Sequence, residues 1–179
     1  MRRLAQATRR SGTPTQRIWY LLLAVLLAGC THARADCTGP TDCRPPFAAT
    51  ALDGTELGDE AVTGKVVLVN FWATWCAPCA RELPALQSVY DRHKPDGFVV
   101  LGVVTGDRAG DDKVRDFAAH RQVRYPLLRG TAELERRFGM GDALPTSYLY
   151  DRRGHLVRRW EGDISEPDLE SLIQQTLAQ

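Results

Sequence analysis

The chain has 179 residues, of which 23 are basic and 22 acidic, and 44% are hydrophobic. This composition supplies an apolar core for one ordinary domain and offers no basic excess for a nucleic-acid surface. The charge is unevenly placed, because five arginines and no acidic residue fall within residues 1–29. Without that leader, 18 basic residues face 22 acidic ones, a formal charge of −4. We therefore expect no nucleic-acid partner.

Residues 1–29 have the pattern of a secretion signal. After the arginines, Ile18–Ala28 is almost wholly apolar, yet too short for a comfortable membrane span. Leu27-Ala28-Gly29-Cys30 resembles the lipobox of bacterial lipoproteins. We expect cleavage before Cys30 and a lipid anchor on this cysteine, which would hold the chain at the periplasmic side of a membrane. Cleavage at Ala33-Arg34-Ala35, giving a soluble periplasmic protein, is the main alternative, and an uncleaved anchor is the other. The sequence does not select between the inner and the outer membrane.

Residues 30–46 are rich in threonine, proline and aspartate and are expected to form an exposed tether. This segment contains Cys37 and Cys43, which Gly39-Pro40 can bring together by turning the chain. An oxidising compartment favours a structural disulfide between them. A second redox-active pair is the alternative, because a short exposed bridge is readily reduced.

Residues 47–179 show the strand and helix patterns of one α/β domain. The segment Phe47–Leu57 carries the turn signal Leu52-Asp53-Gly54-Thr55, which predicts a β-hairpin. Val66–Phe71 is apolar on both faces, as expected of a central strand covered by helices. A helix should follow from about Cys76 to His93, interrupted and kinked at Pro84.

The second half of the domain continues this alternation and ends in a helix capped by Ser165. Together with the first half it predicts a mixed β-sheet with helices on both faces. The expected elements are a strand at Phe98–Val104, a helix at Asp111–Arg121, an extended piece at Tyr125–Leu128, a short helix at Ala132–Phe138, a hairpin of strands 147–150 and 156–160, and a final helix at Glu166–Leu177.

The central strand leads directly into Trp75-Cys76-Ala77-Pro78-Cys79. The first cysteine falls where unpaired helix N–H groups and the helix dipole favour a thiolate, and the second follows within one turn, close enough to form a disulfide with it. This arrangement predicts thiol–disulfide exchange. Half of a zinc site is the alternative, but it needs two more ligands. The four histidines are scattered, at His32, His93, His120 and His155, so we expect no metal.

The stretch Phe71–Pro84, FWATWCAPCARELP, resembles the active site of membrane-tethered thioredoxin-like disulfide reductases of the TlpA/ResA group, within the redoxin or AhpC/TSA-like superfamily. The Leu-Asp-Gly hairpin before it and Leu144-Pro145-Thr146 after it fit the same group. The resemblance covers roughly residues 45–178. It implies a thioredoxin fold with an extra N-terminal β-hairpin and a central insertion near residues 105–130.

The resemblance also implies roles for individual residues. Cys76 would be the nucleophile and Cys79 the resolving thiol. Pro145 matches the cis-proline of the family, and with Trp75 and Leu144 it would shape the substrate groove.

Glu82 corresponds to a glutamate that the reductase branch keeps near its thiols. A carboxylate there would disfavour the thiolate and relay a proton to it. The alternative is a solvated charge on the helix surface. Asn70 stands where ordinary thioredoxins have a buried acid, which would shift acid–base duty toward Glu82.

The expected activity is the reduction of protein disulfides, because Ala77-Pro78 places no charge between the thiols. We expect no cofactor. By analogy, the substrates include the haem-attachment cysteines of apocytochrome c, with electrons from a membrane transporter of DsbD or CcdA type. A disulfide oxidase or isomerase is the alternative and differs in reduction potential. A thiol peroxidase is less favoured, because the peroxidase Pro-x-x-x-Thr-x-x-Cys is absent. A Sco-type copper chaperone is also less favoured, because the two cysteines of that class are one residue further apart.

Overall fold

The computed structural model describes residues 42–46 and 48–179. Their centre is a five-stranded sheet in the order β5-β4-β3-β6-β7, in which β3, β4 and β5 run parallel and β6 and β7 run antiparallel to their neighbours. The strands are β3 (Val66–Trp72), β4 (Phe98–Val104), β5 (Leu127–Arg129), β6 (Thr146–Tyr150) and β7 (Leu156–Glu161).

Strand β3 occupies the middle of the sheet, and all seven of its residues are buried. Because side chains alternate along a strand, Val67, Val69 and Phe71 pack into the core on one face, whereas Leu68 and Trp72 pack into the core on the other. Burial on both faces explains why this segment is continuously apolar apart from Asn70.

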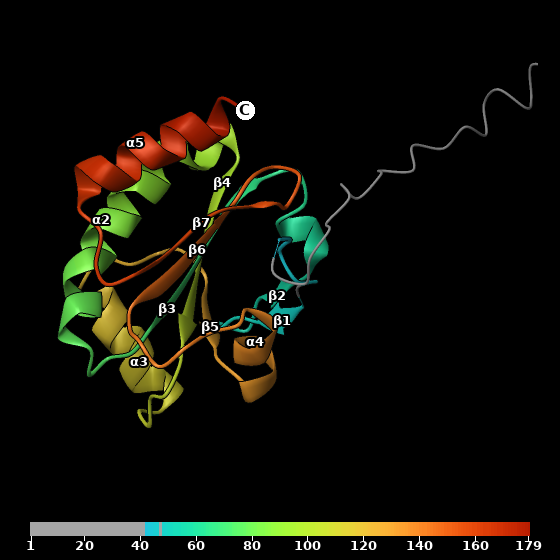
Figure 1. Ribbon diagram of the computed structural model, residues 1–179. Coiled ribbons are helices and arrows are strands. Elements are labelled where there is room, and N and C mark those ends of the chain that lie inside the picture. The colour runs from blue at the N-terminus through green and yellow to red at the C-terminus, as the bar shows by residue number, and fades with distance from the viewer. Residues whose placement is uncertain (1–41, 47) are drawn as a thin grey trace, which may run out of the picture. The chain divides into compact units, whose positions relative to one another are not determined.

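Helices cover both faces of the sheet, as expected (Figure 1). Three of them, α2 (Ala77–His93), α3 (Asp111–Ala119) and α5 (Glu166–Leu177), pack on the face that we call the α2 face. The opposite face, here the hairpin face, is covered by the hairpin of β1 (Ala49–Thr50) and β2 (Glu56–Leu57) with α4 (Ala132–Arg137). Two short 3-10 helices, η1 (Asp59–Ala61) and η2 (Lys94–Asp96), complete the elements.

The structure confirms the predicted order of elements and changes three details. The extended piece before α4 is a true edge strand, β5, shifted toward Arg129 and paired with β4. Helix α2 continues through Pro84 without the expected interruption. Helix α3 ends at Ala119, two residues early, and Gln122 takes a left-handed conformation in the turn that follows.

The N-terminal hairpin forms where its turn signal places it. The Ala51 N–H donates to Thr55 O (2.8 Å), the Asp53 carboxylate accepts from the Thr55 N–H (2.9 Å), and Gly54 supplies the left-handed residue (φ 88°). Ala51 also forms a bridge to Leu128 of β5, which joins the hairpin to the sheet edge.

The described end of the predicted tether is attached to the domain. Cys43 forms an antiparallel bridge with His155, and the Arg44 N–H donates to Gly154 O (2.7 Å). Arg44 also pairs with Asp59 (3.2 Å). Within the described residues, no helix combines the length and apolarity that crossing a membrane requires.

Candidate active site: a disulfide at the start of helix α2

Cys76 and Cys79 form a disulfide with their Cα atoms 5.3 Å apart. Cys76 is the N-cap of α2, and its sulfur accepts a hydrogen bond from the Cys79 N–H (3.2 Å). Pro78 occupies the first turn, where a missing N–H costs no helical hydrogen bond. The helix N-terminus therefore directs its positive end at the Cys76 sulfur, the arrangement that lowers the pKa of a thiol.

The two cysteines differ in accessibility. Cys76 keeps 4% of its surface exposed, whereas Cys79 is fully buried. A substrate can reach a sulfur only from solvent, so the site presents Cys76 outward and Cys79 as the inner thiol. This asymmetry agrees with the order of reaction that the sequence predicts.

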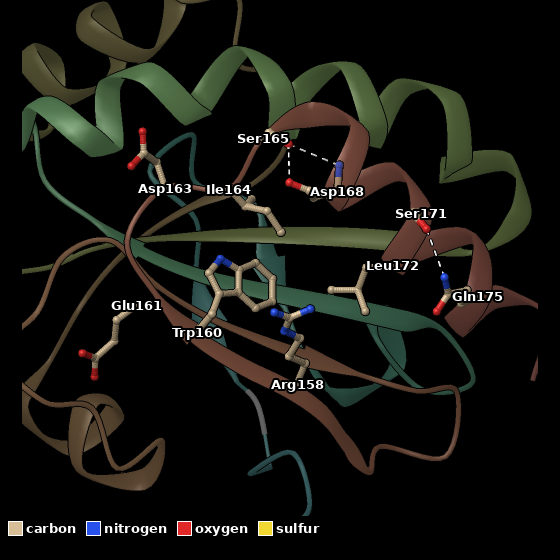
Figure 2. A pocket seen from close by; sticks show the side chains of 10 residues that line it. All are labelled: Arg158, Trp160, Glu161, Asp163, Ile164, Ser165, Asp168, Ser171, Leu172 and Gln175. Atoms are coloured by element: carbon tan, nitrogen blue, oxygen red, sulfur yellow. Dashed lines mark hydrogen bonds between the residues drawn. The ribbon is translucent and has the colours of Figure 1, made fainter.

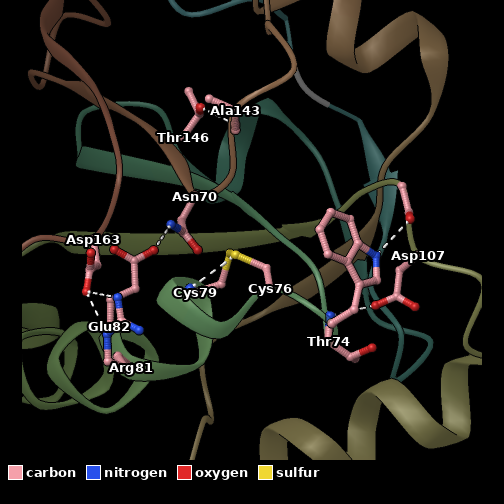
Figure 3. The surroundings of a disulfide bond; sticks show 12 residues. Asn70, Thr74, Cys76, Cys79, Arg81, Glu82, Asp107, Ala143, Thr146 and Asp163 are labelled. Carbon is pink, nitrogen blue, oxygen red and sulfur yellow. Dashed lines mark hydrogen bonds and ion pairs between the residues drawn. A yellow bond between two sulfur atoms is a disulfide. The ribbon is translucent and has the colours of Figure 1, made fainter.

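One wall beside the disulfide is built by Trp75 and the loop after β4. Trp75 is 64% exposed, and its indole N–H donates to Gly106 O (3.0 Å). Asp107 accepts from the Thr74 N–H (2.6 Å) with one carboxylate oxygen and from the Ala109 N–H (2.8 Å) with the other. Asp107 thus clamps the segment before Cys76 to the loop, on the right of the disulfide in Figure 3. These bonds lower the pKa of Asp107, although its burial opposes them.

Leu144 and Pro145 precede β6, and the peptide bond between them is cis, as the sequence predicts. Pro145 is buried, and its carbonyl accepts from the Gly162 N–H (2.8 Å). The Thr146 hydroxyl donates to Ala143 O (2.7 Å) and closes the turn. Leu144 is only partly buried and contacts the cores of both faces. That these residues form the substrate groove stays a prediction.

Glu82 lies in the interior, not on the surface of α2, because only 2% of it is exposed. The Asn70 amide donates to Glu82 Oε1 (2.6 Å) and to the Ser147 hydroxyl (3.0 Å). Asn70 and Ser147 are register partners on β3 and β6. Figure 3 shows Glu82 and Asn70 on the opposite side of the disulfide from Asp107. The alternative of a solvated helix charge is therefore wrong.

Burial raises the pKa of Glu82 from its ordinary 4.5 to about 7. The Asn70 hydrogen bond works against this shift, as does the Ile164 backbone, which lies near the carboxylate but outside hydrogen-bonding geometry. The negative charge of Asp163 adds to the shift. A carboxyl group that titrates near neutral pH therefore lies one helical turn after Cys79.

Two sequence expectations, the lipid anchor on Cys30 and the disulfide between Cys37 and Cys43, concern cysteines near the N-terminus. Cys30 and Cys37 lie outside the described residues, so lipid attachment and the pairing of Cys37 stay predictions. Cys43 is disulfide-bonded. Within residues 42–46 and 48–179, no cluster of three histidine, cysteine or carboxylate side chains could hold a metal ion.

A groove of about 580 Å³ lies between β7 and α5 (Figure 2). Apolar side chains of Trp160, Ile164 and Leu172 share its lining with charged residues, among them Arg158 and Asp168. Neither cysteine contributes to it. This hollow is therefore separate from the exchange site, although Ile164 connects its lining to the surroundings of Glu82.

Comparison with known proteins agrees with this geometry. The model of the AhpC/TSA family matches residues 40–159. The chain belongs to that family. Thiol-disulfide oxidoreductase ResA of Geobacillus kaustophilus (strain HTA426) is 32% identical over 131 residues, which cover 73% of this chain and 74% of that protein. With its oxidised Cys76–Cys79 pair, the chain is a thiol–disulfide oxidoreductase of this type.

Solved structures show the same fold. A thiol:disulfide interchange protein of the thioredoxin family from Chlorobium tepidum TLS superimposes with a TM-score of 0.71 at 27% identity, covering 76% of this chain and 97% of that one. A second Chlorobium tepidum structure, described as a putative thiol:disulfide interchange protein DsbE, gives 0.65 at 30% identity, covering 77% and 95%. The thioredoxin fold predicted from the sequence is confirmed.

Proposed function

We propose that the chain is an extracytoplasmic reductase of protein disulfides that works through the Cys76–Cys79 dithiol. The observation that carries this proposal is the position of the pair: Cys76 caps α2 and keeps a small exposed area, whereas Cys79 is fully buried. The names of similar proteins, a thiol-disulfide oxidoreductase and a thiol:disulfide interchange protein, support thiol–disulfide exchange as the reaction.

The reaction follows from this placement. The Cys76 thiolate attacks one sulfur of the substrate disulfide, the substrate S–S bond breaks, and the released thiolate takes a proton from water. Cys79 gives its proton to Glu82 and attacks the Cys76 sulfur of the mixed disulfide. The Cys76–Cys79 bond forms, and the second substrate sulfur leaves as a thiolate. Two electrons pass to the substrate, and the chain reaches the oxidised state seen in the structure.

Glu82 is proposed as the base for the second step. Its pKa of about 7 means that the ionised form needed to accept a proton becomes populated near neutral pH. Resolution of the mixed disulfide should then accelerate as pH rises through 7. Glu82→Gln should lose this dependence and slow resolution by about 100-fold or more. An unchanged pH–rate profile in the variant would remove the proton role.

The location and partners are also proposals. Lipid attachment at Cys30 would hold the domain at the periplasmic side of a bacterial membrane, and soluble secretion is the alternative. A membrane thiol-electron transporter of DsbD or CcdA type would return two electrons to the disulfide. Oxidised haem-attachment cysteines of apocytochrome c are the proposed substrates. Loss of the chain from the membrane fraction in Cys30→Ser would support the anchor, and retention would exclude it.

A trapping experiment tests the reductase proposal. Reduced Cys79→Ser protein is mixed with an oxidised peptide containing Cys-x-x-Cys-His, and with insulin as a general protein disulfide. A mixed disulfide through Cys76 that persists in Cys79→Ser and never forms in Cys76→Ser is expected. Equal trapping of both probes supports a general reductase, and preference for the peptide supports a role in cytochrome c maturation. Trapping of neither probe contradicts the proposal.

A further inference from the structure

Tyr125 is a buried residue outside the dithiol motif, on the α2 face of the sheet. Only 2% of it is exposed. Its backbone N–H donates to the Gln87 side chain of α2 (3.3 Å), and its ring packs edge-on against Tyr90, with ring centres 6.1 Å apart. Its hydroxyl has no hydrogen-bond partner in the part of the chain that the structure describes. A buried hydroxyl without a partner is costly, which indicates a further group at this position.

The missing side chain of Gly102 leaves space for the Tyr125 ring near Asn70, which bonds Glu82. A Cβ atom at Gly102 would lie 2.9 Å from Tyr125 Cε2 and 3.2 Å from Trp72 Nε1, so both side chains occupy the space that the glycine leaves open. Gly102 of β4 is the register partner of Asn70 of β3. Because register partners on neighbouring strands share a face, the Tyr125 ring is a lateral neighbour of Asn70.

Seven buried side-chain polar atoms have no partner among the described residues, and four of them belong to Asn70, Trp72, Glu82 and Tyr125. Two are donors, the Trp72 indole N–H and the Tyr125 hydroxyl. Two are acceptors, Asn70 Oδ1 and Glu82 Oε2. One water molecule accepts two hydrogen bonds and donates two, so it matches this set.

We propose that one buried water joins Tyr125 and Trp72 to Asn70 and Glu82, and that Tyr125 is thereby a positioning residue for the Glu82 carboxylate. The inference deepens the acid–base role proposed for Glu82. It concerns the surroundings of the carboxylate, however, and holds for the oxidised protein whether or not Glu82 acts in exchange.

The electrostatics agree with a neutral tyrosine that donates toward the carboxylate. Burial and the charge of Glu82 raise the pKa of Tyr125 well above its usual range, so its hydroxyl keeps its proton. A hydrogen bond delivered through water favours the ionised form of Glu82 and restrains the rise in its pKa. The other charged group acting on Glu82 is Asp163, which pairs with Arg81 (3.1 Å).

The test is the Glu82 pKa in the oxidised protein, followed by carbon-13 NMR of labelled glutamate. Tyr125→Phe removes only the hydroxyl and should raise this pKa by about one unit. Tyr150→Phe is the matched control, because Tyr150 is equally buried but packs on the hairpin face. It should leave the Glu82 pKa unchanged. An unchanged pKa in folded Tyr125→Phe overturns the inference.

A second measurement needs no variant. A high-resolution crystal structure of the oxidised wild-type protein should show one water within hydrogen-bond distance of Tyr125 Oη and Glu82 Oε2. A dry site would overturn the inference even if Tyr125→Phe does not fold. Neither readout involves substrate turnover, so failure here is distinguishable from failure of the reductase proposal.

Discussion

The two faces of the central sheet are built from the same strand and differ in chemistry. On the hairpin face, Phe71, Phe138 and Tyr148 meet edge to face, with ring centres 5.4 to 5.9 Å apart. On the α2 face, the apolar core surrounds the disulfide, Glu82 and Asn70. Two consecutive residues of β3 face these two environments: Phe71 points to the hairpin face and Asn70 to the α2 face.

The difference shows how a small domain remains stable with buried polar groups beside its dithiol. Buried polar groups on the α2 face cost desolvation energy, and several have no hydrogen-bond partner among the described residues. The close aromatic packing on the hairpin face offsets this cost in stability. The dithiol lies on the α2 face. Substitutions on the hairpin face should therefore change stability alone, and substitutions on the α2 face should change thiol chemistry or its pH dependence.

The largest expected effect belongs to Phe138→Ala on the hairpin face. Loss of a buried ring that contacts Phe71, Tyr148 and Tyr150 should lower the free energy of unfolding by about 3–5 kcal/mol. Chemical denaturation of the oxidised protein measures this. The reduction potential of the dithiol in the folded variant should equal that of the wild type. A shifted potential would break the separation between the two faces.

Glu82→Gln should remove a pH dependence of stability. Between pH 4.5 and about 7, folded Glu82 keeps a proton that the unfolded chain has released, so the wild-type protein loses stability as pH rises through this window. The loss amounts to about 3 kcal/mol. The unfolding free energy should be measured at pH 4 and at pH 8 for both proteins. The decrease from pH 4 to pH 8 should be larger in the wild type than in the variant by this amount. Parallel curves for the two proteins would contradict the raised pKa.

Asp107→Asn should loosen the wall beside the disulfide. The amide replaces one acceptor oxygen by a donor, so either the Thr74 or the Ala109 N–H loses its partner. We expect about 2 kcal/mol of destabilisation and faster hydrogen exchange at the Thr74 amide. Asp112→Asn is the control, because among the described residues Asp112 forms only an exposed ion pair with Arg115. Equal effects in both variants would rule out a specific clamp.

Trp75→Ala should weaken substrate contact and cause the smallest change in the free energy of unfolding among these variants. The exposed indole makes one hydrogen bond, so stability should fall by less than about 1 kcal/mol, whereas reduction of a protein disulfide should slow by about tenfold. Val157→Ala removes another exposed apolar side chain, from β7, and should leave the rate unchanged. A Trp75 variant as fast as wild type would show that this wall does not bind substrate.

The sequence predicts the local features of the site and misses its long-range contacts. The dithiol at a helix start follows from a short motif, the family resemblance implies the cis Leu144–Pro145 bond, and both are found. The Asp107 clamp joins residues 33 positions apart, and Asn70 reaches Ser147 across 77. No local pattern encodes either contact, because each depends on which strands become neighbours.

The fold shows the same division. Strand β3 is evident from seven consecutive buried residues. Strand β5 is only three residues long, of which Leu128 alone is buried, and it exists through its pairing with β4. Pro84 predicts an interruption by local rules, yet packing of α2 on the sheet and α5 keeps the helix continuous. The pKa of Glu82 likewise depends on the segment before α5, more than 80 residues away, because Asp163 and the Ile164 backbone act on the carboxylate.

The reduction potential of the Cys76–Cys79 pair tests the central claim most directly. It should be measured against defined thiol buffers in a soluble form of the chain that begins after Cys30. A reductase requires a value near or below the roughly −270 mV of thioredoxin. A value near the roughly −120 mV of DsbA would contradict the account and assign the chain to disulfide formation or isomerisation.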